Sequence, residues 1–265
     1  MDVGGITGVG GISAEVAESV EDKGMEEGNA LAHLRGVLLR HRLIPVARLD
    51  SVRDAEPLAD ALQRAGLPLL QVDLTTSASL GAIAAIRSAF TGFVVGAGAM
   101  HLESQLEGAL YAGAQFGSGP VMNPALLAAA RAAGFPFLPG AMTPSEIECG
   151  IRWGCLVQCI YPAAAIGGPP MVRALAEACL ETRMVWVSAG GVRMEDFQEY
   201  LAIPGVGAVA GGFVCEQALI EAGMWEDIEA QALLCRRKAD AAVRARFGEE
   251  AFKTELQEES EEIFR

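Results

Sequence analysis

Lysine is nearly absent from the sequence. Only three of its 20 basic residues are lysines, and they stand at Lys23, Lys238 and Lys253. The long stretch from residue 24 to residue 237 therefore contains no side-chain amine. Because an imine with a keto substrate needs such an amine, this stretch cannot support Schiff-base catalysis on a lysine.

Positive charge and long apolar runs are also scarce. The formal net charge is −14, which argues against nucleic acid and anionic membrane surfaces as partners. Hydrophobic residues make up 51% of the chain, yet no unbroken run of 18 predicts a membrane span. The start is acidic and glycine-rich, unlike a signal or transit peptide. We expect a soluble intracellular protein, in the cytoplasm or in an organelle stroma or matrix after presequence removal.

Metal-ligand patterns are missing as well. The six cysteines form no CxxC pair, and Cys155 and Cys159 have no histidine nearby to complete a ligand set. We predict buried or half-buried thiols, no metal site and no cofactor. His33 and His41 precede the first predicted strand and are interpreted as surface or packing residues.

From Ala30 onward, short apolar runs alternate with amphipathic stretches of helical period. The predicted strands lie at about 44–49, 69–74, 93–98, 115–117, 136–139, 156–161, 185–189 and 206–210. The predicted helices lie at about 52–66, 77–89, 102–113, 123–134, 143–153, 169–182 and 193–202. Eight such units indicate an α/β fold, a (β/α)8 TIM barrel. Ser77, Asn123 and Thr143 are predicted as helix N-caps.

Three segments are expected along the chain. Residues 1–32 form an acidic, glycine-rich extension, and residues 33–223 form the barrel. Residues 224–265 form a helical, acidic C-terminal extension with one apolar face.

Candidate site residues follow from strand alternation, because active sites of such barrels lie at the carboxyl ends of the strands. The candidates are Arg48, Gln71, Asp73, Thr75, His101, Ser118, Cys159, Tyr161 and Ser188.

Several segments together carry a family resemblance. They include Leu70-Gln71-Val72-Asp73-Leu74-Thr75-Thr76, Gly96-Ala97-Gly98, Pro136-Phe137-Leu138-Pro139-Gly140 and Tyr161-Pro162-Ala163. In order and spacing, residues 33–222 resemble the KDPG/KHG aldolases, which cleave 2-keto-3-deoxy-6-phosphogluconate or 4-hydroxy-2-oxoglutarate to release pyruvate. The resemblance implies a homotrimer of (β/α)8 barrels.

The sequence departs from the family pattern where that pattern places its chemistry. By the resemblance, Cys159 replaces the lysine that binds pyruvate, and Gln71 replaces the general-base glutamate. Thr75 replaces the arginine that contacts the substrate carboxylate. Ala99 and Ala189 replace threonines of the pattern. Phe213 replaces a serine and is a candidate plug of the site.

These losses favour a catalytically degenerate barrel with a structural, scaffolding or assembly role, with its terminal extensions reaching a larger complex. No catalytic residue is then expected, because an amide has no useful basicity and a thiol gives no iminium. Asp73 is interpreted as an ion-pair partner of Arg48, Cys159 as a core thiol and His101 as a capping or surface group.

The remaining binding feature is a set of glycines at the strand ends. By the resemblance, their backbone N–H groups cradle a substrate phosphate. The candidate ligand-binding residues are Gly167, Gly168, Gly190, Gly191, Gly211, Gly212 and Arg48. Tight strand-to-helix turns explain the same glycines equally well.

Two other hypotheses stay open. One is a lyase for 2-keto-3-deoxy sugar acid phosphates or 4-hydroxy-2-oxoglutarate by altered chemistry, with Asp73, Cys159 or His101 replacing the lost groups. The other is a protein that binds a sugar phosphate or keto acid without turning it over.

Overall fold

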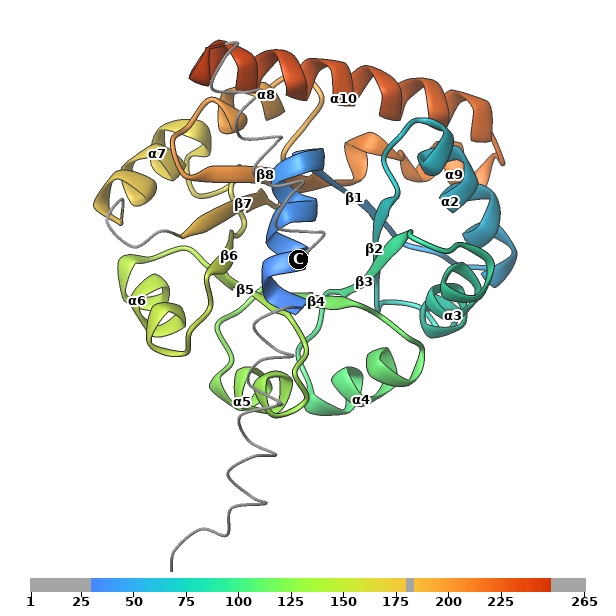
Figure 1. Cartoon of the computed structure of the whole chain (residues 1–265), viewed down its shortest axis with the longest axis horizontal. Coiled ribbons are helices and arrows are strands. Elements are labelled where there is room, and N and C mark those ends of the chain that lie inside the picture. Colours follow the sequence, from blue (N-terminus) through green and yellow to red (C-terminus); the bar gives the residue numbers. More distant parts are fainter. Residues whose placement is uncertain (1–29, 180–183, 249–265) are drawn as a thin grey trace, which may run out of the picture.

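Eight parallel strands close into a barrel with strand order β1 to β8 (Figure 1). The computed structural model describes residues 30–179 and 184–248. The acidic N-terminal segment up to residue 29 and the tail from residue 249 lie outside the described residues. The predicted (β/α)8 barrel is confirmed.

The strands are short and buried. They are β1 (Leu43–Ala47), β2 (Leu69–Asp73), β3 (Val94–Gly98), β4 (Phe116–Gly119), β5 (Phe137–Ala141), β6 (Val157–Ile160), β7 (Val185–Ala189) and β8 (Val206–Gly211). Each lies within or beside a predicted apolar run, because a barrel strand is covered by side chains on one face and by helices on the other.

Helices form the outer ring. They are α2 (Ala55–Arg64), α3 (Ser79–Ala89), α4 (Glu103–Tyr111), α5 (Pro124–Ala132), α6 (Pro144–Arg152), α7 (Gly168–Ala178), α8 (Phe197–Leu201), α9 (Gln217–Glu221) and α10 (Trp225–Phe247), with short 3-10 turns η1 (Val52–Asp54) and η3 (Gly212–Val214). In the described part of the chain, no helix is long and apolar enough to cross a membrane.

The caps agree with the sequence at two of three positions. Asn123 accepts from two backbone amides of α5, and Thr143 forms a capping box with Glu146 at α6. The prediction for Ser77 is wrong. Ala78 is the N-cap residue of α3, and the Ser79 hydroxyl donates to the Asp73 carbonyl at 2.8 Å.

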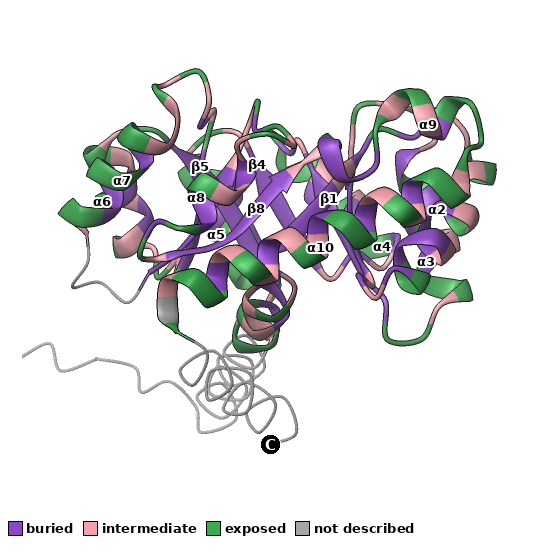
Figure 2. Ribbon diagram, turned by 90° about the horizontal axis from the view of Figure 1, so that it is seen from above, coloured by how far each residue is buried: buried purple, intermediate pink, exposed green. Residues whose placement is uncertain are grey.

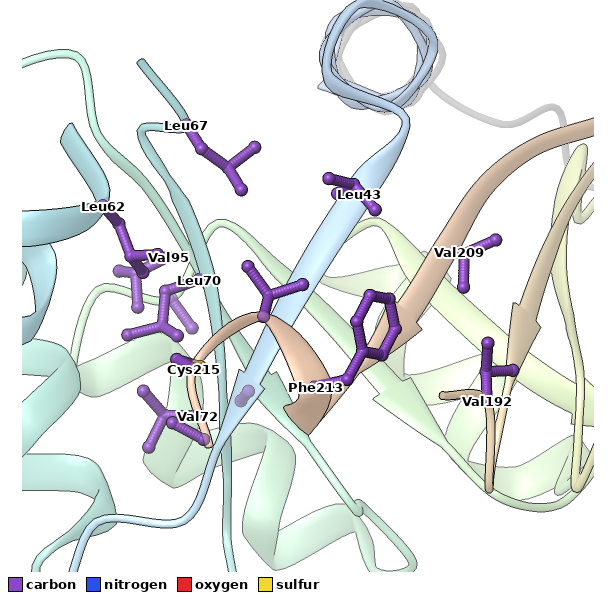
Figure 3. Close-up of a cluster of buried hydrophobic side chains, with 14 of the residues drawn as sticks. Leu43, Leu62, Leu67, Leu70, Val72, Val95, Val192, Val209, Phe213 and Cys215 are labelled. Carbon is purple, nitrogen blue, oxygen red and sulfur yellow. The ribbon is translucent and has the colours of Figure 1, made fainter. Parts of the chain in front are cut away.

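Two apolar layers hold the barrel together. The outer layer lies between the sheet and the helices, and Figure 3 shows part of it, with Leu70, Val72 and Val95 pointing away from the barrel axis. The inner layer fills the barrel with alternate residues of the same strands, among them Leu69 and Phe116. In the side view of Figure 2 the strands are mostly buried and the outer faces of the helices exposed.

A helix over residues 30–41 closes the amino end of the barrel. It crosses the centre of the ring in Figure 1, and its Leu34, Val37 and Leu38 are buried in the inner layer together with Ile44. The barrel interior is therefore sealed with apolar side chains at the end where the strands begin.

Helix α10 packs along the barrel against α2 and α8 (Figure 1). Its Ile228, Ala232, Cys235 and Ala239 are fully buried in the outer layer. The predicted boundary at residue 224 stays a prediction, but up to Phe247 this segment covers the barrel beside β8 and β1 as an outer helix does.

Candidate active site

A cavity of about 470 Å³ opens where the strands end. Every strand except β5 contributes lining residues, either from the strand itself or from the loop that follows it. The described residues that line the cavity include no lysine or arginine. The lining residues are Ile44, Val46, Gln71, Asp73, Ala99, His101, Ser118, Gly119, Pro120, Cys159, Tyr161, Ala189, Gly190, Gly191, Val192, Ala210, Gly211 and Gly212.

A chain of hydrogen bonds joins three polar side chains on the wall of this cavity. The Ser118 hydroxyl donates to Gln71 Oε1 at 2.8 Å, and Gln71 Nε2 donates to Asp73 Oδ1 at 3.0 Å. Gln71 and Asp73 share the inner face of β2 because side chains alternate along a strand. The chain therefore runs from β4 across β3 to the carboxyl end of β2.

The glycines of β3 make this reach possible. Gly98 pairs with Asp73 in the ladder between β2 and β3. A Cβ atom on Gly98 would lie 2.1 Å from Asp73 Oδ1 and 2.2 Å from Gln71 Nε2. Only glycine leaves room at this position for both side chains to lie over the neighbouring strand.

Burial raises the pKa of the Asp73 carboxyl above its ordinary value, and the hydrogen bond from Gln71 opposes that rise. The predicted ion pair with Arg48 is wrong. Arg48 is exposed beyond the end of β1 and pairs with Asp50 at 2.9 Å. Arg48 does not line the cavity, so its predicted ligand-binding role has no support from the geometry.

Cys159 lies in the cavity floor and is buried. Burial alone raises the pKa of its thiol to about 12. At neutral pH the group is a thiol and not a thiolate, and it is therefore a poor nucleophile. The interpretation of Cys159 as a core thiol agrees with this burial.

Tyr161 and His101 stand at the rim. Tyr161 directly follows β6, and its ring leaves no room for a side chain at Gly190, where a Cβ would lie 2.8 Å from two ring carbons. His101 follows β3, and its backbone N–H donates to the Gln105 side chain at 2.7 Å. Both side chains line the cavity as the sequence predicted.

The predicted glycines divide into two groups. Gly190, Gly191, Gly211 and Gly212 line the cavity, whereas Gly167 and Gly168 do not. The backbone N–H groups of Gly167 and Gly168 donate to the carbonyls of Ala164 and Ala163, in the turn that starts α7. Those two glycines serve the turn.

Three other candidates lie elsewhere. Ser188 is fully buried and is not among the cavity residues, because its neighbours Val187 and Ala189 take the inner face of β7. Thr75 is exposed beyond the end of β2. Phe213 does not plug the mouth, since its ring stacks on Phe197 with centroids 5.1 Å apart.

The sequence did not identify the apolar part of the wall. Ile44 and Val46 of β1 and Ala210 of β8 line the cavity, as does the Gly119-Pro120 turn after β4. Strand alternation could have found the first three, because they occupy inner-face positions of β1 and β8. Nothing in the sequence marks the Gly119-Pro120 turn as part of the site.

In closed (β/α)8 barrels that are enzymes, the active site lies at the carboxyl ends of the strands, and here a cavity with several polar side chains lies at that end. The family model for KDPG and KHG aldolase matches residues 34–231. The chain belongs to this family.

Curated relatives support this family membership. The chain is 36% identical over 193 residues to the 2-dehydro-3-deoxy-phosphogluconate aldolase of Treponema pallidum, which covers 73% of the chain and 91% of the relative. It is 31% identical over 192 residues to the KHG/KDPG aldolase of Escherichia coli K12, covering 72% and 89%. Among solved structures, the KDPG aldolase of Legionella pneumophila with pyruvate captured as a covalent carbinolamine superimposes with a TM-score of 0.73 at 29% identity. That match covers 76% of this chain and 97% of the other.

These relatives overturn the prediction of a degenerate scaffolding barrel. They match most of the chain, and their names describe an aldolase and not a structural protein. The missing lysine removes one catalytic route, the lysine imine, and does not by itself remove all activity.

Proposed function

We propose that this protein is a carbon–carbon lyase for 2-keto-3-deoxy sugar acid phosphates or 4-hydroxy-2-oxoglutarate, working without a lysine imine. One observation carries the proposal. A carboxyl group with a raised pKa, Asp73, lies in the barrel cavity and accepts a hydrogen bond from Gln71. A carboxylate whose pKa lies closer to neutrality is a stronger base while it is ionised.

Asp73 acts as the acid–base group. Its carboxylate takes the proton of the substrate C4 hydroxyl, the bond between C3 and C4 breaks, and the aldehyde product leaves. The bonding electrons pass to the C2 carbonyl and form an enolate. Asp73 then returns the proton to C3, which gives pyruvate and restores the carboxylate, so that no proton is gained or lost overall.

Neutral donors stabilise the enolate oxygen in place of an iminium. The candidates that line the cavity are the second N–H of the Gln71 amide and the Tyr161 hydroxyl. Fixed donors in a site with little water stabilise developing charge far better than they do in bulk solution.

The phosphate of the substrate binds to the turn after β7. Gly190 and Gly191 have φ angles of 87° and 78°, a conformation that L side chains rarely adopt. In the described part of the chain, their N–H groups donate to no backbone carbonyl. Two adjacent free N–H groups suit an anion. Gly211 and Gly212 lie beside them on the cavity wall.

The test is direct. Pyruvate release from each substrate is followed with lactate dehydrogenase for the wild type, Asp73→Asn and, as matched control, Asp50→Asn. We expect turnover by the wild type, a loss of about 10²- to 10⁴-fold in kcat/KM for Asp73→Asn, and little change for the exposed Asp50→Asn. Borohydride with pyruvate should trap no adduct by mass.

Two results would overturn the proposal. One is a borohydride-trapped adduct on any side chain. The other is absence of turnover with both substrates. If either substrate then still raises the melting temperature, the protein is a binding protein for phosphorylated metabolites or keto acids.

We also infer a homotrimer in solution. Support comes from the family, and from apolar side chains on the outer ring such as Tyr111, which is 97% exposed, and Leu110 beside it on α4. Light scattering after gel filtration should give three times the mass of one chain, and a monomer would contradict the inference.

A further inference from the structure

The acid–base group of the proposed function does not stand alone in the cavity. Asp73 is the last member of the hydrogen-bonded chain that begins at Ser118. Ser118 and Gln71 are both buried, whereas Asp73 is partly exposed toward the cavity. The two inner members therefore have little access to water and depend on each other for hydrogen bonds.

Ser118 has a fixed position. It belongs to β4, and its carbonyl accepts a hydrogen bond at 3.0 Å from the backbone N–H of Met100, just after β3. Its hydroxyl reaches Gln71 on β2 although β3 lies between β2 and β4. The opening over Gly98 permits this contact, because any larger residue would displace the amide.

The direction of the hydrogen bonds matters for the charge on Asp73. An ionised carboxylate only accepts, so it needs the Nε2 side of the Gln71 amide. The Oε1 atom of the amide then points away from Asp73 and needs a donor of its own. Ser118 supplies that donor at 2.8 Å. Donation to Oε1 also polarises the amide and strengthens its N–H bond to the carboxylate.

We propose that Ser118 is a positioning residue that acts through Gln71 to hold Asp73 ionised and in place for catalysis. The inference rests on the proposed function, because it concerns the same acid–base group. Ser118 contacts the amide and not the reacting carboxyl, so its effect on the reaction is indirect.

Other groups around Asp73 must be considered for a pH effect. The titratable side chains that line the cavity are His101 after β3, Cys159 on β6 and Tyr161 after β6. Arg48 and Asp50 follow β1 but pair with each other. The cavity-lining residues of β7 and β8 have no titratable side chain. A substitution at Ser118 removes none of these titratable groups.

A matched pair of variants isolates the hydroxyl. Thr and Val have nearly the same shape, but only Thr keeps a donor, so Ser118→Thr is compared with Ser118→Val. The titration midpoint of the Asp73 carboxyl is read from its carbon NMR signal, which is assigned by its loss in Asp73→Asn. The pH dependence of kcat/KM is measured in parallel.

We expect a higher Asp73 midpoint in Ser118→Val than in Ser118→Thr, by at least about 0.4 on the pH scale, as for one modest hydrogen bond. On the acid side, kcat/KM should fall by roughly 2- to 10-fold in Ser118→Val and recover at higher pH. Equal midpoints in the two variants would overturn the proposal, even if Ser118→Val melts at a lower temperature. Because the NMR titration needs no turnover, a failure of the lyase activity itself is recognised separately.

Discussion

The two ends of the barrel are finished in opposite ways. At the amino end, the helix over residues 30–41 fills the opening with buried leucines and a valine. Arg40 belongs to this helix and Arg42 follows it directly. At the carboxyl end the opening is a cavity whose polar groups include the Asp73 carboxyl, the Gln71 amide and the Ser118 hydroxyl, and no lysine or arginine lines it among the described residues. Substitutions at the closed end should therefore affect folding, and substitutions at the open end should affect chemistry.

The largest effect on stability is expected at the closed end. Leu38 is fully buried in the inner apolar layer. Leu38→Ala should lower the free energy of unfolding by about 2–5 kcal/mol, because it leaves a cavity under the barrel. Urea denaturation measures the loss. Pyruvate release per folded molecule should stay near that of the wild type, and a selective loss of activity would break the comparison.

The next substitution should affect both stability and catalysis. Gly98→Ala at the open end places a methyl group against both Asp73 and Gln71. Overpacking of this kind typically costs about 1–3 kcal/mol, and here it also displaces the acid–base group. We expect a moderate fall in melting temperature together with a large fall in kcat/KM. Gly134→Ala on the outer ring is the control, because its added methyl meets no atom within 4 Å and its cost comes from a φ of 62°. It should lower stability without changing activity per folded molecule. Unchanged activity in Gly98→Ala would show that Asp73 need not occupy its observed position.

A residue at the closed end, His41, should make the free energy of unfolding depend on pH. Burial, with help from Arg236 and Arg40, lowers the pKa of His41 from 6.5 to about 4. The unfolded chain therefore takes up a proton below pH 6.5 that the folded chain takes up only near pH 4. The His41 contribution is fully present above pH 6.5 and is lost as the pH falls toward 4. His41→Gln should flatten this slope, whereas the same change at the exposed His33 should not; equal slopes would refute the assignment.

The smallest expected effect on stability is a gain, and it comes from Asp73→Asn at the open end. The folded state raises the pKa of Asp73, so its folded form binds the proton more tightly than the unfolded chain does. This destabilising contribution is absent at acid pH and grows as the pH rises through the two pKa values. Asp73→Asn should therefore raise the melting temperature slightly at pH 7 and not at pH 3, while activity falls. A lower melting temperature at pH 7 would contradict the assignment of Asp73 as a strained functional group.

The sequence predicted the barrel well because every strand of it carries buried side chains on both faces. It also placed Gln71, Asp73, Ser118, Cys159 and Tyr161 on the inner face, since alternation along a strand is strict. It failed with Arg48 and Thr75 because alternation continues only as far as the strand does. Both residues lie beyond the last ladder pair, where the chain turns outward.

The register between strands was not predictable from periodicity. That Ser118 reaches Gln71 depends on the pairing of β2, β3 and β4, and on the missing side chain of Gly98 between them. The sequence showed the three polar residues but gave no reason to join them. Its choice of Arg48 as the partner of Asp73 followed from charge alone, and an amide on the same strand was nearer.

The protonated state of Cys159 has a consequence for a site that releases aldehydes. Aldehydes readily form covalent adducts with amines and thiolates. The thiol in the cavity floor stays protonated far above neutral pH, and the described wall of the cavity offers no lysine. The cavity therefore resists inactivation by its own aldehyde product, and electrophiles that react with the lysine of imine-forming aldolases should find no amine or thiolate in this cavity wall.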